Sequence, residues 1–251
     1  MKRLALIATL AILAFFVAIP AASAVTDLNN IPITDTLEAG TLEWDLTVKY
    51  NEDFARGRSI DTRLFGALFE NFEFGMSWGI SRPAGPFKLS LKYKVLDEYG
   101  GGLPVSVAVG AEGITGNYER TGMDPTYYGV IGRHDVRLVG LWDWYVGYYY
   151  TPTEISTPDY VADSDSSVFG GFKYWINDDL QFNADYWGYH EMEEYIIAGG
   201  LNYDWVNHIG IQGWVEHDSG AAGGDGDTFF VLQLVARADM RDLTAEVSDP
   251  E

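Results

Sequence analysis

Charged side chains occupy every second position in several extended stretches, and they are the residues in this chain that could do chemistry. Near the start, Glu43 and Asp45 lie between Leu42, Trp44 and Leu46. Side chains two apart on an extended strand share a face, so this spacing gathers charges on one side. The predicted charged face holds Glu43, Asp45, Lys49, Asp61, Arg63, Glu73, Lys88, Lys92, Lys94, Glu112, Lys173, Asp185, Asp204, Glu216 and Arg237. Charges held inside a protein either pair with one another or line a water path.

Hydrolytic chemistry is one alternative, because the chain has four histidines: His134, His190, His208 and His217. His217 is followed directly by Asp218 and Ser219, but a catalytic triad normally assembles from residues distant in sequence. The G-x-S-x-G nucleophile motif is absent. We therefore expect histidines in loops and no catalysis, with a lipid hydrolase as the weaker alternative.

Metal binding has little support in the sequence. Residues 163–167 (DSDSS) begin like a calcium-binding loop, but Val168 replaces the glycine and Tyr174 the final carboxylate that such a loop needs. The 225–227 stretch (DGD) is shorter still. We predict no metal site and no organic cofactor.

The elements that would position the charged face are β-strands. Apolar and polar residues alternate with a period of two and no helical period competes, so we predict an all-β protein. The predicted strands, about twelve in number, cover residues 41–50, 59–69, 72–81, 86–96, 103–112, 126–138, 142–151, 167–176, 180–189, 194–205, 208–217 and 228–238. Strands of about ten residues suit a tilted crossing of a membrane.

Connection lengths follow a regular order along the chain. Most connections after odd-numbered strands are long and polar, whereas most after even-numbered strands are tight. An antiparallel up-and-down barrel places these two sets at opposite ends, and outer-membrane barrels have long loops outside and short turns inside. The sequence thus predicts a single transmembrane barrel with a charged lumen.

Alternation alone leaves open which face is outside. In a membrane barrel, Leu42, Leu46, Phe74, Met76, Leu89 and Leu91 would face lipid, and an aromatic girdle would comprise Trp44, Tyr50, Trp78, Tyr93, Trp142, Tyr150, Tyr186 and Trp205. In the alternative, a secreted or periplasmic soluble barrel, the apolar face would point inward and bind an apolar ligand. The aromatic residues near strand ends favour the membrane.

The ends of the chain and its composition bound the remaining possibilities. Residues 1–24 have the basic start, apolar run and Ala22-Ser23-Ala24 site of a cleaved signal peptide. We expect residues 25–40 to form a periplasmic lead-in, 41–240 the barrel and 241–251 an acidic tail. A net charge of −21 argues against nucleic acid as a partner, and the absence of cysteine excludes disulfides and thiol chemistry.

The Ile31-Pro32 lead-in, the opening strand at residues 40–44 (GTLEW) and the stretches at 72–79 (FEFGMSWG) and 87–93 (FKLSLKY) also carry a resemblance. The chain resembles small bacterial outer-membrane β-barrel proteins of the YjbH-like or porin-like kind. This resemblance implies an outer-membrane location, contact with lipid and lipopolysaccharide, insertion by the barrel-insertion machinery, and a monomer. The resemblance implies location and fold better than task, and for the predicted barrel with its charged lumen our leading hypothesis is a narrow passive channel or a structural component of the envelope. One departure is that the chain continues past Met240 instead of ending in a strand with a terminal aromatic residue.

Overall fold

The computed structural model describes residues 27–51, 58–80, 87–100, 102–114, 125–152, 155–157, 160–162, 165–189, 194–206, 208–220 and 226–240. The predicted signal peptide, the acidic tail and His190 lie outside these ranges. No helix among the described residues is long and apolar enough to cross a membrane.

The described chain is built of antiparallel strands. Their bounds are β1 Thr41–Asn51, β2 Arg58–Phe69, β3 Phe72–Gly79, β4 Lys88–Leu96, β5 Ser106–Ile114, β6 Thr126–Leu138, β7 Gly140–Thr151, β8 Ile155–Thr157, β9 Tyr160–Ala162, β10 Asp165–Trp175, β11 Leu180–Tyr189, β12 Glu194–Val206, β13 Ile209–Asp218 and β14 Asp227–Asp239. All except β8 and β9 form one closed barrel, in the order β1-β14-β13-β12-β11-β10-β7-β6-β5-β4-β3-β2.

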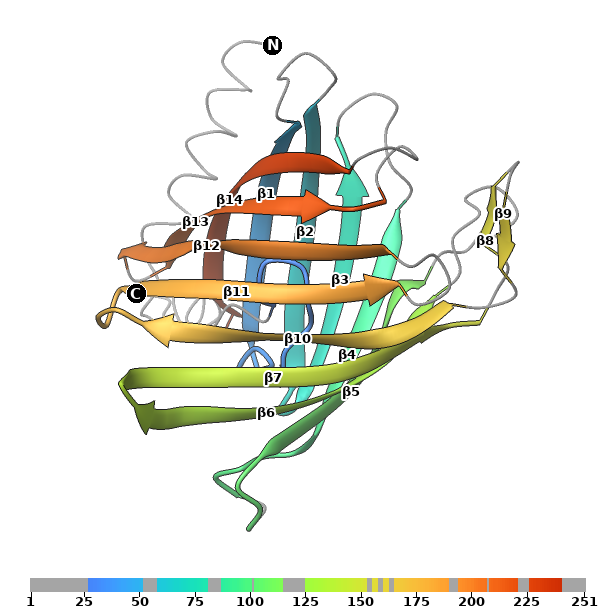
Figure 1. The fold of residues 1–251 in the computed structure, drawn as a ribbon. Coiled ribbons are helices and arrows are strands. Elements are labelled where there is room, and N and C mark those ends of the chain that lie inside the picture. Colours follow the sequence, from blue (N-terminus) through green and yellow to red (C-terminus); the bar gives the residue numbers. More distant parts are fainter. Residues whose placement is uncertain are drawn as a thin grey trace, which may run out of the picture.

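The barrel closes where the first and last strands pair. β1 and β14 match along their whole length, from Thr41 opposite Asp239 to Asn51 opposite Phe229. In Figure 1 the strands of the near wall run across those of the far wall, as expected when strands tilt strongly to close a barrel. We call the end with the short connections, such as the one between β2 and β3, the turn end, and the opposite end the loop end.

The predicted all-β barrel of twelve strands is confirmed, with small differences at strand ends. β5 begins at Ser106 and not at 103, because Pro104 has no N–H to donate to a ladder. β7 begins at Gly140, whose φ of 90° forms the tight turn with β6. The sequence analysis missed the β8–β9 hairpin, which lies inside one of the connections that we expected to be long and polar.

Burial shows which face of the wall points inward. On β1, Glu43 and Asp45 are buried, whereas Leu42, Trp44 and Leu46 between them are partly exposed. On β4, Lys92 is buried, whereas Leu89 and Leu91 are 39% and 43% exposed. The apolar side chains therefore cover the outside of the barrel, and the charged ones line its lumen.

Candidate functional site in the barrel lumen

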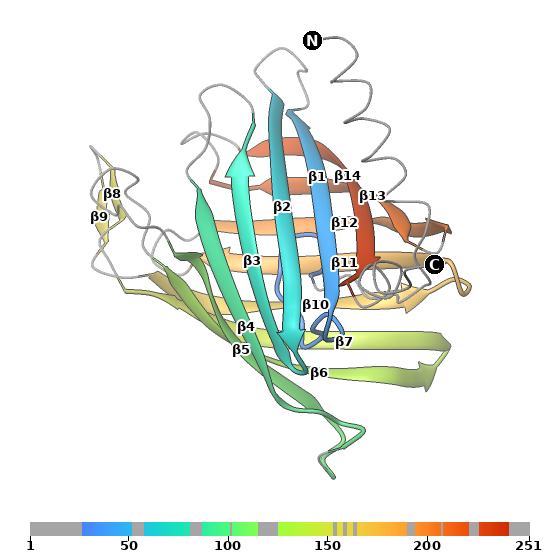
Figure 2. The same ribbon diagram turned by 180° about the vertical axis from the view of Figure 1, so that it is seen from behind.

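Residues 27–40, which we call the lumen segment, lie inside the barrel and precede β1. The blue trace between the near and far walls in Figures 1 and 2 is this segment. Gly40 fixes its outer end at the turn end of the barrel: its N–H donates to the Ala67 carbonyl at 2.6 Å, and its carbonyl accepts from the Met240 N–H at 2.8 Å. The chain thus reaches the lumen through the turn end.

The lumen segment contacts opposite walls. The Asn30 N–H donates to Asp185 on β11 at 3.1 Å, and the Leu37 N–H donates to Glu73 on β3 at 3.0 Å. In the twelve-strand ring, β11 and β3 lie directly across from one another. The segment therefore spans the lumen from wall to wall.

Apolar packing holds the middle of the segment. Leu28, Ile31 and Ile33 are at most 2% exposed. They form one cluster with wall residues Ala108, Tyr128, Val130, Tyr145, Tyr149 and Phe169, which come from β5, β6, β7 and β10. Burial of an aliphatic side chain of this size contributes about 1.5–3 kcal/mol. The hydrophobic effect thus favours a segment seated in the lumen over one left in water.

Two wall glycines leave room for the segment. A Cβ atom at Gly171 would lie 2.7 Å from Leu28 Cδ1 and 2.6 Å from the Ala184 carbonyl oxygen. A Cβ atom at Gly132 would lie 2.8 Å from the Thr34 hydroxyl. Any larger residue at either position would push against the seated segment.

Asp27 joins a network of charges near the inner end of the segment. Its carboxylate lies 3.5 Å from Arg63 and 4.0 Å from Lys92. Lys92 also pairs with Glu73 at 3.2 Å, and Glu73 accepts the Leu37 N–H. Because Lys92 and Glu73 are buried, each depends on the other and on the segment for compensation of its charge.

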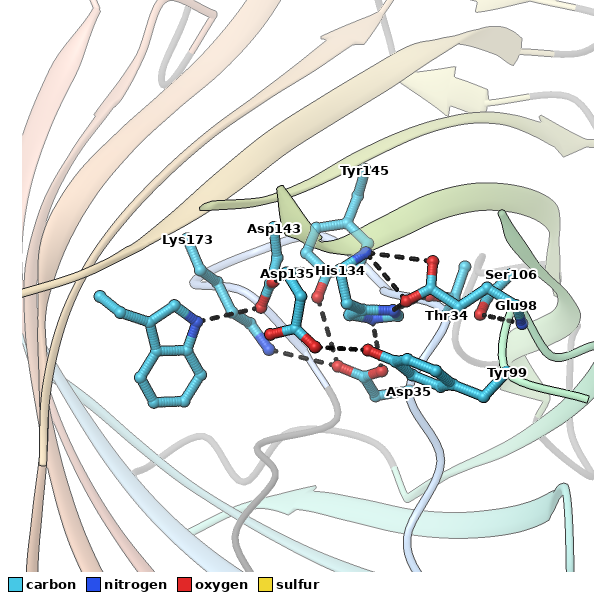
Figure 3. Close-up of polar contacts among 11 residues, drawn as sticks. Thr34, Asp35, Glu98, Tyr99, Ser106, His134, Asp135, Asp143, Tyr145 and Lys173 are labelled. Atoms are coloured by element: carbon cyan, nitrogen blue, oxygen red, sulfur yellow. Dashed lines mark hydrogen bonds and ion pairs between the residues drawn. The ribbon is translucent and has the colours of Figure 1, made fainter. Parts of the chain in front are cut away.

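Asp35 forms the second polar anchor of the segment (Figure 3). Its carboxylate lies 2.8 Å from His134 Nε2 and 3.4 Å from Lys173 Nζ, and it accepts the Tyr145 hydroxyl at 3.3 Å. Burial alone would raise the pKa of Asp35. The Lys173 charge and the hydrogen bond from His134 outweigh burial and hold that pKa well below its usual range.

A β-bulge in β6 directs His134 toward the segment. The pairing of β6 with β7 shifts between Arg133 and Val136, and Asp135 has a φ of 54°. The Asp135 N–H donates to Asp143 at 2.9 Å, which holds the bulge in place. His134 then lies between two carboxylates, because its Nδ1 is 3.0 Å from Glu98.

Tyr99 braces the same bulge from the connection between β4 and β5. Its hydroxyl donates to the Asp135 carboxylate at 2.6 Å (Figure 3). Partial burial and this hydrogen bond raise the pKa of Tyr99. The turn end of the barrel therefore has a polar cluster that links a strand bulge, a turn and the lumen segment.

Many predicted charged positions come together in the lumen. Glu43 pairs with Arg237, Lys49 with Glu216 and Glu73 with Lys92. Five predicted positions contact the segment: Arg63, Glu73, Lys92, Lys173 and Asp185. Within the described ranges no ion pair shorter than 4 Å is formed by Asp61, Lys88, Lys94 or Glu112. Asp204 lies on the lumen-facing side of β12. Lys88, Lys92 and Lys94 share β4, but only Lys92 pairs with an acid of the third strand.

The outward positions carry the predicted apolar and aromatic residues. Phe74 and Met76 on β3 alternate with the inward Glu73 and Gly75. The predicted aromatic residues form two levels: Trp44, Tyr93, Trp142 and Trp205 lie toward the turn end, and Tyr50, Trp78, Tyr150 and Tyr186 toward the loop end. The Trp142 and Tyr174 rings lie on the outer surface with their centroids 4.6 Å apart and their planes tilted by 44°.

The sequence analysis missed the lumen segment, which it treated as a lead-in to the barrel. A signal was present, because Leu28, Ile31, Ile33 and Leu37 place four aliphatic residues in a stretch that would otherwise face water. It also expected histidines to lie in loops, which is wrong for His134 in β6 and for His217 in β13. Within the described ranges no group of His, Asp and Glu is arranged to hold a metal ion, and Asp165 of the calcium-like stretch begins β10.

Comparisons with known proteins support the fold. No family model matches the chain, and no curated protein matches it. Among solved structures, the NanC porin aligns with a TM-score of 0.55 at 14% identity, over 77% of this chain and 98% of its own. An outer-membrane channel from Pseudomonas putida F1 aligns with a TM-score of 0.53 at 13% identity, over 82% and 98%. The KdgM porin, solved with disordered oligogalacturonate, gives 0.51 at 10% identity, over 77% and 98%. The barrel therefore has the fold of outer-membrane porins and channels.

Proposed function

We propose that this protein is an outer-membrane β-barrel that acts as a narrow passive channel, with the lumen segment as its constriction. The observation that carries the proposal is that the apolar face of the barrel wall points outward and the charged face points into the lumen. Apolar side chains such as Leu201 and Leu232, 49% and 55% exposed, cover the outside, and charged pairs lie inside. Such a surface is costly in water and favourable in lipid.

The aromatic levels and the connections support the same setting. Trp and Tyr rings favour the two lipid–water interfaces, and the outward rings of this barrel lie near both ends of the strands. By the loop asymmetry of bacterial outer-membrane barrels, the turn end would face the periplasm. The lumen segment would then enter from the periplasmic side, with residues 1–24 removed as a signal peptide.

The alternative of a soluble barrel around an apolar ligand has weaker support. Its apolar residues would point inward, whereas Leu89 and Leu91 point outward. Fractionation of cells tests this alternative directly. Recovery of the protein in the soluble periplasmic fraction, without detergent, would overturn the membrane proposal.

Catalysis is not part of the proposal. His134 lies between the Asp35 and Glu98 carboxylates, and His217 Nδ1 lies 3.4 Å from the Thr228 hydroxyl. Neither of these arrangements brings a serine nucleophile to a histidine that a carboxylate orients. The barrel is proposed to be a monomer in contact with lipid and lipopolysaccharide.

Planar-bilayer recording of the refolded protein tests the channel. We expect small conductance steps for the complete protein, and larger steps for a variant that lacks residues 27–37, because the segment no longer spans the lumen. Correct insertion is checked by the heat-sensitive gel mobility of a folded barrel. If both proteins insert and both remain silent, the channel is refuted and a structural role in the envelope is favoured.

A further inference from the structure

One side of the lumen has a row of uncharged polar side chains that the lumen segment does not use. Gln181, Asn202, Gln212, Gln233 and Thr47 lie directly opposite one another on five consecutive strands: β11, β12, β13, β14 and β1. All five are buried. We call this row the amide belt.

Several polar atoms of the belt have no hydrogen-bond partner among the described residues. These are Asn202 Oδ1, Gln212 Nε2 and Thr47 Oγ1. Asn183 Oδ1, two residues beyond Gln181 on the same face of β11, has no partner either. A buried polar group without a partner destabilises a protein, so native structures rarely keep several of them together without a role. Each carboxamide offers a donor and an acceptor, and the hydroxyl offers both. The missing partner must therefore donate and accept along one row.

Charge around the belt favours an uncharged partner. Toward the loop end the nearest charges are Lys49 and Glu216, which already pair with each other, and toward the turn end Arg237 pairs with Glu43. Asp45 on β1 and Asp204 on β12 border the belt on the turn side and would repel an anion. A cation would be repelled by the unpartnered NH₂ group of Gln212 and by the Lys49 ammonium. A hydroxyl-rich neutral molecule meets none of these penalties.

We propose that the amide belt is the solute-contact surface of the lumen and that it selects small neutral polyols and sugars over charged solutes of the same size. The two sides of the lumen then have different roles. The side formed by β2 to β7 and β10 holds the carboxylates Asp27 and Asp35 of the segment, whereas the other side bonds the segment at Asp185 on β11. The side formed by β11 to β14 and β1 offers exchangeable hydrogen bonds. This proposal rests on the proposed channel and adds its class of solute.

Tracer exchange in proteoliposomes provides the test. Three six-carbon solutes that differ in charge, namely sorbitol, gluconate and glucamine, are placed at equal concentrations on both sides, so that no net charge moves during exchange. We expect sorbitol to exchange fastest. In the double variant Asn202→Leu, Gln212→Met, which keeps similar volumes without the amides, sorbitol exchange should fall about tenfold, since about two modest hydrogen bonds are lost.

Two further variants make the outcome decisive. Thr47→Val removes one hydroxyl at nearly constant shape and should lower sorbitol exchange even if the double variant does not fold. Lys88→Met changes a lumen residue on the other side and should leave the preference for sorbitol unchanged. Equal rates for the three solutes, or rates unaffected by the belt variants, would overturn the belt and leave the channel standing. If no solute exchanges through correctly inserted barrels, both the channel and the belt are refuted.

Discussion

Loss of one buried aliphatic group should unseat the lumen segment measurably. Ile31 is fully buried in the cluster that joins the segment to β6 and β7. An Ile→Ala change at such a site costs about 2–4 kcal/mol, because it removes apolar contacts and leaves a cavity. In the unseated state the side chain contacts water, so Ile31→Ala destabilises the seated state relative to the unseated one. The unseated fraction should rise about 30- to 700-fold.

Thiol labelling measures this fraction without any assumption about transport. The chain has no cysteine, so Thr34→Cys introduces one thiol at a fully buried position of the segment. When opening is rapid, the labelling rate follows the open population. We expect slow labelling of Thr34→Cys alone and labelling faster by the factor above when Ile31→Ala is added.

A matched control isolates the lumen contact. Ile197→Ala makes the same deletion on the outer face of β12, where Ile197 is 45% exposed, and it should leave the labelling rate unchanged. If Ile31→Ala labels no faster than the parent, or if Ile197→Ala accelerates labelling equally, apolar packing does not seat the segment.

Three further changes test the other contacts of the segment. Because the pKa of Asp35 lies below its usual range, its contribution to stability is complete above about pH 4 and is lost as the pH falls toward the lowered value. The urea midpoint should therefore drop on acidification, and Asp35→Asn should remove that part of the drop. A pH profile in Asp35→Asn that matches the parent would contradict the assignment. Gly171→Ala should destabilise the barrel by about 1–3 kcal/mol, because the new Cβ meets Leu28 and the Ala184 carbonyl. The control Gly129→Ala, with open space around its Cβ, should be neutral or stabilise the barrel by about 0.5 kcal/mol. Equal urea midpoints for the two variants would refute the close approach at Gly171. Lys92→Met leaves Glu73 and Asp27 without their shared cation and should lower the free energy of urea unfolding by about 3–5 kcal/mol. Addition of Glu73→Gln should recover part of that loss. A double variant no more stable than Lys92→Met would argue against the pair.

The strands could be predicted because their cause is local. Residues such as Leu42 and Glu43 alternate because the two faces of each strand meet different surroundings, and a period of two is visible in any short window. Strand count and most boundaries followed from that pattern. The outer placement of Leu89 and Leu91 could not be decided by alternation alone, because an inside-out pattern has the same period.

The lumen segment could not be predicted because its contacts are not local. Asn30 bonds a residue 155 positions away, and no short pattern encodes that distance. The position of His134 depends on a bulge at Asp135, whose positive φ no spacing of residues announces. The charged partners were identified as a set, but their pairing with Asp27 and Asp35 needed the folded barrel.

The attachment of the segment to β1 through Gly40 makes it a tethered ligand of its own barrel. A short link of this kind keeps a ligand at an effective concentration of about millimolar or higher, whatever the amount of protein present. A free peptide with the sequence of residues 27–39 would have to reach that concentration to replace it. Dilution in the membrane therefore leaves the seated state untouched, and only a change in the contacts themselves shifts it.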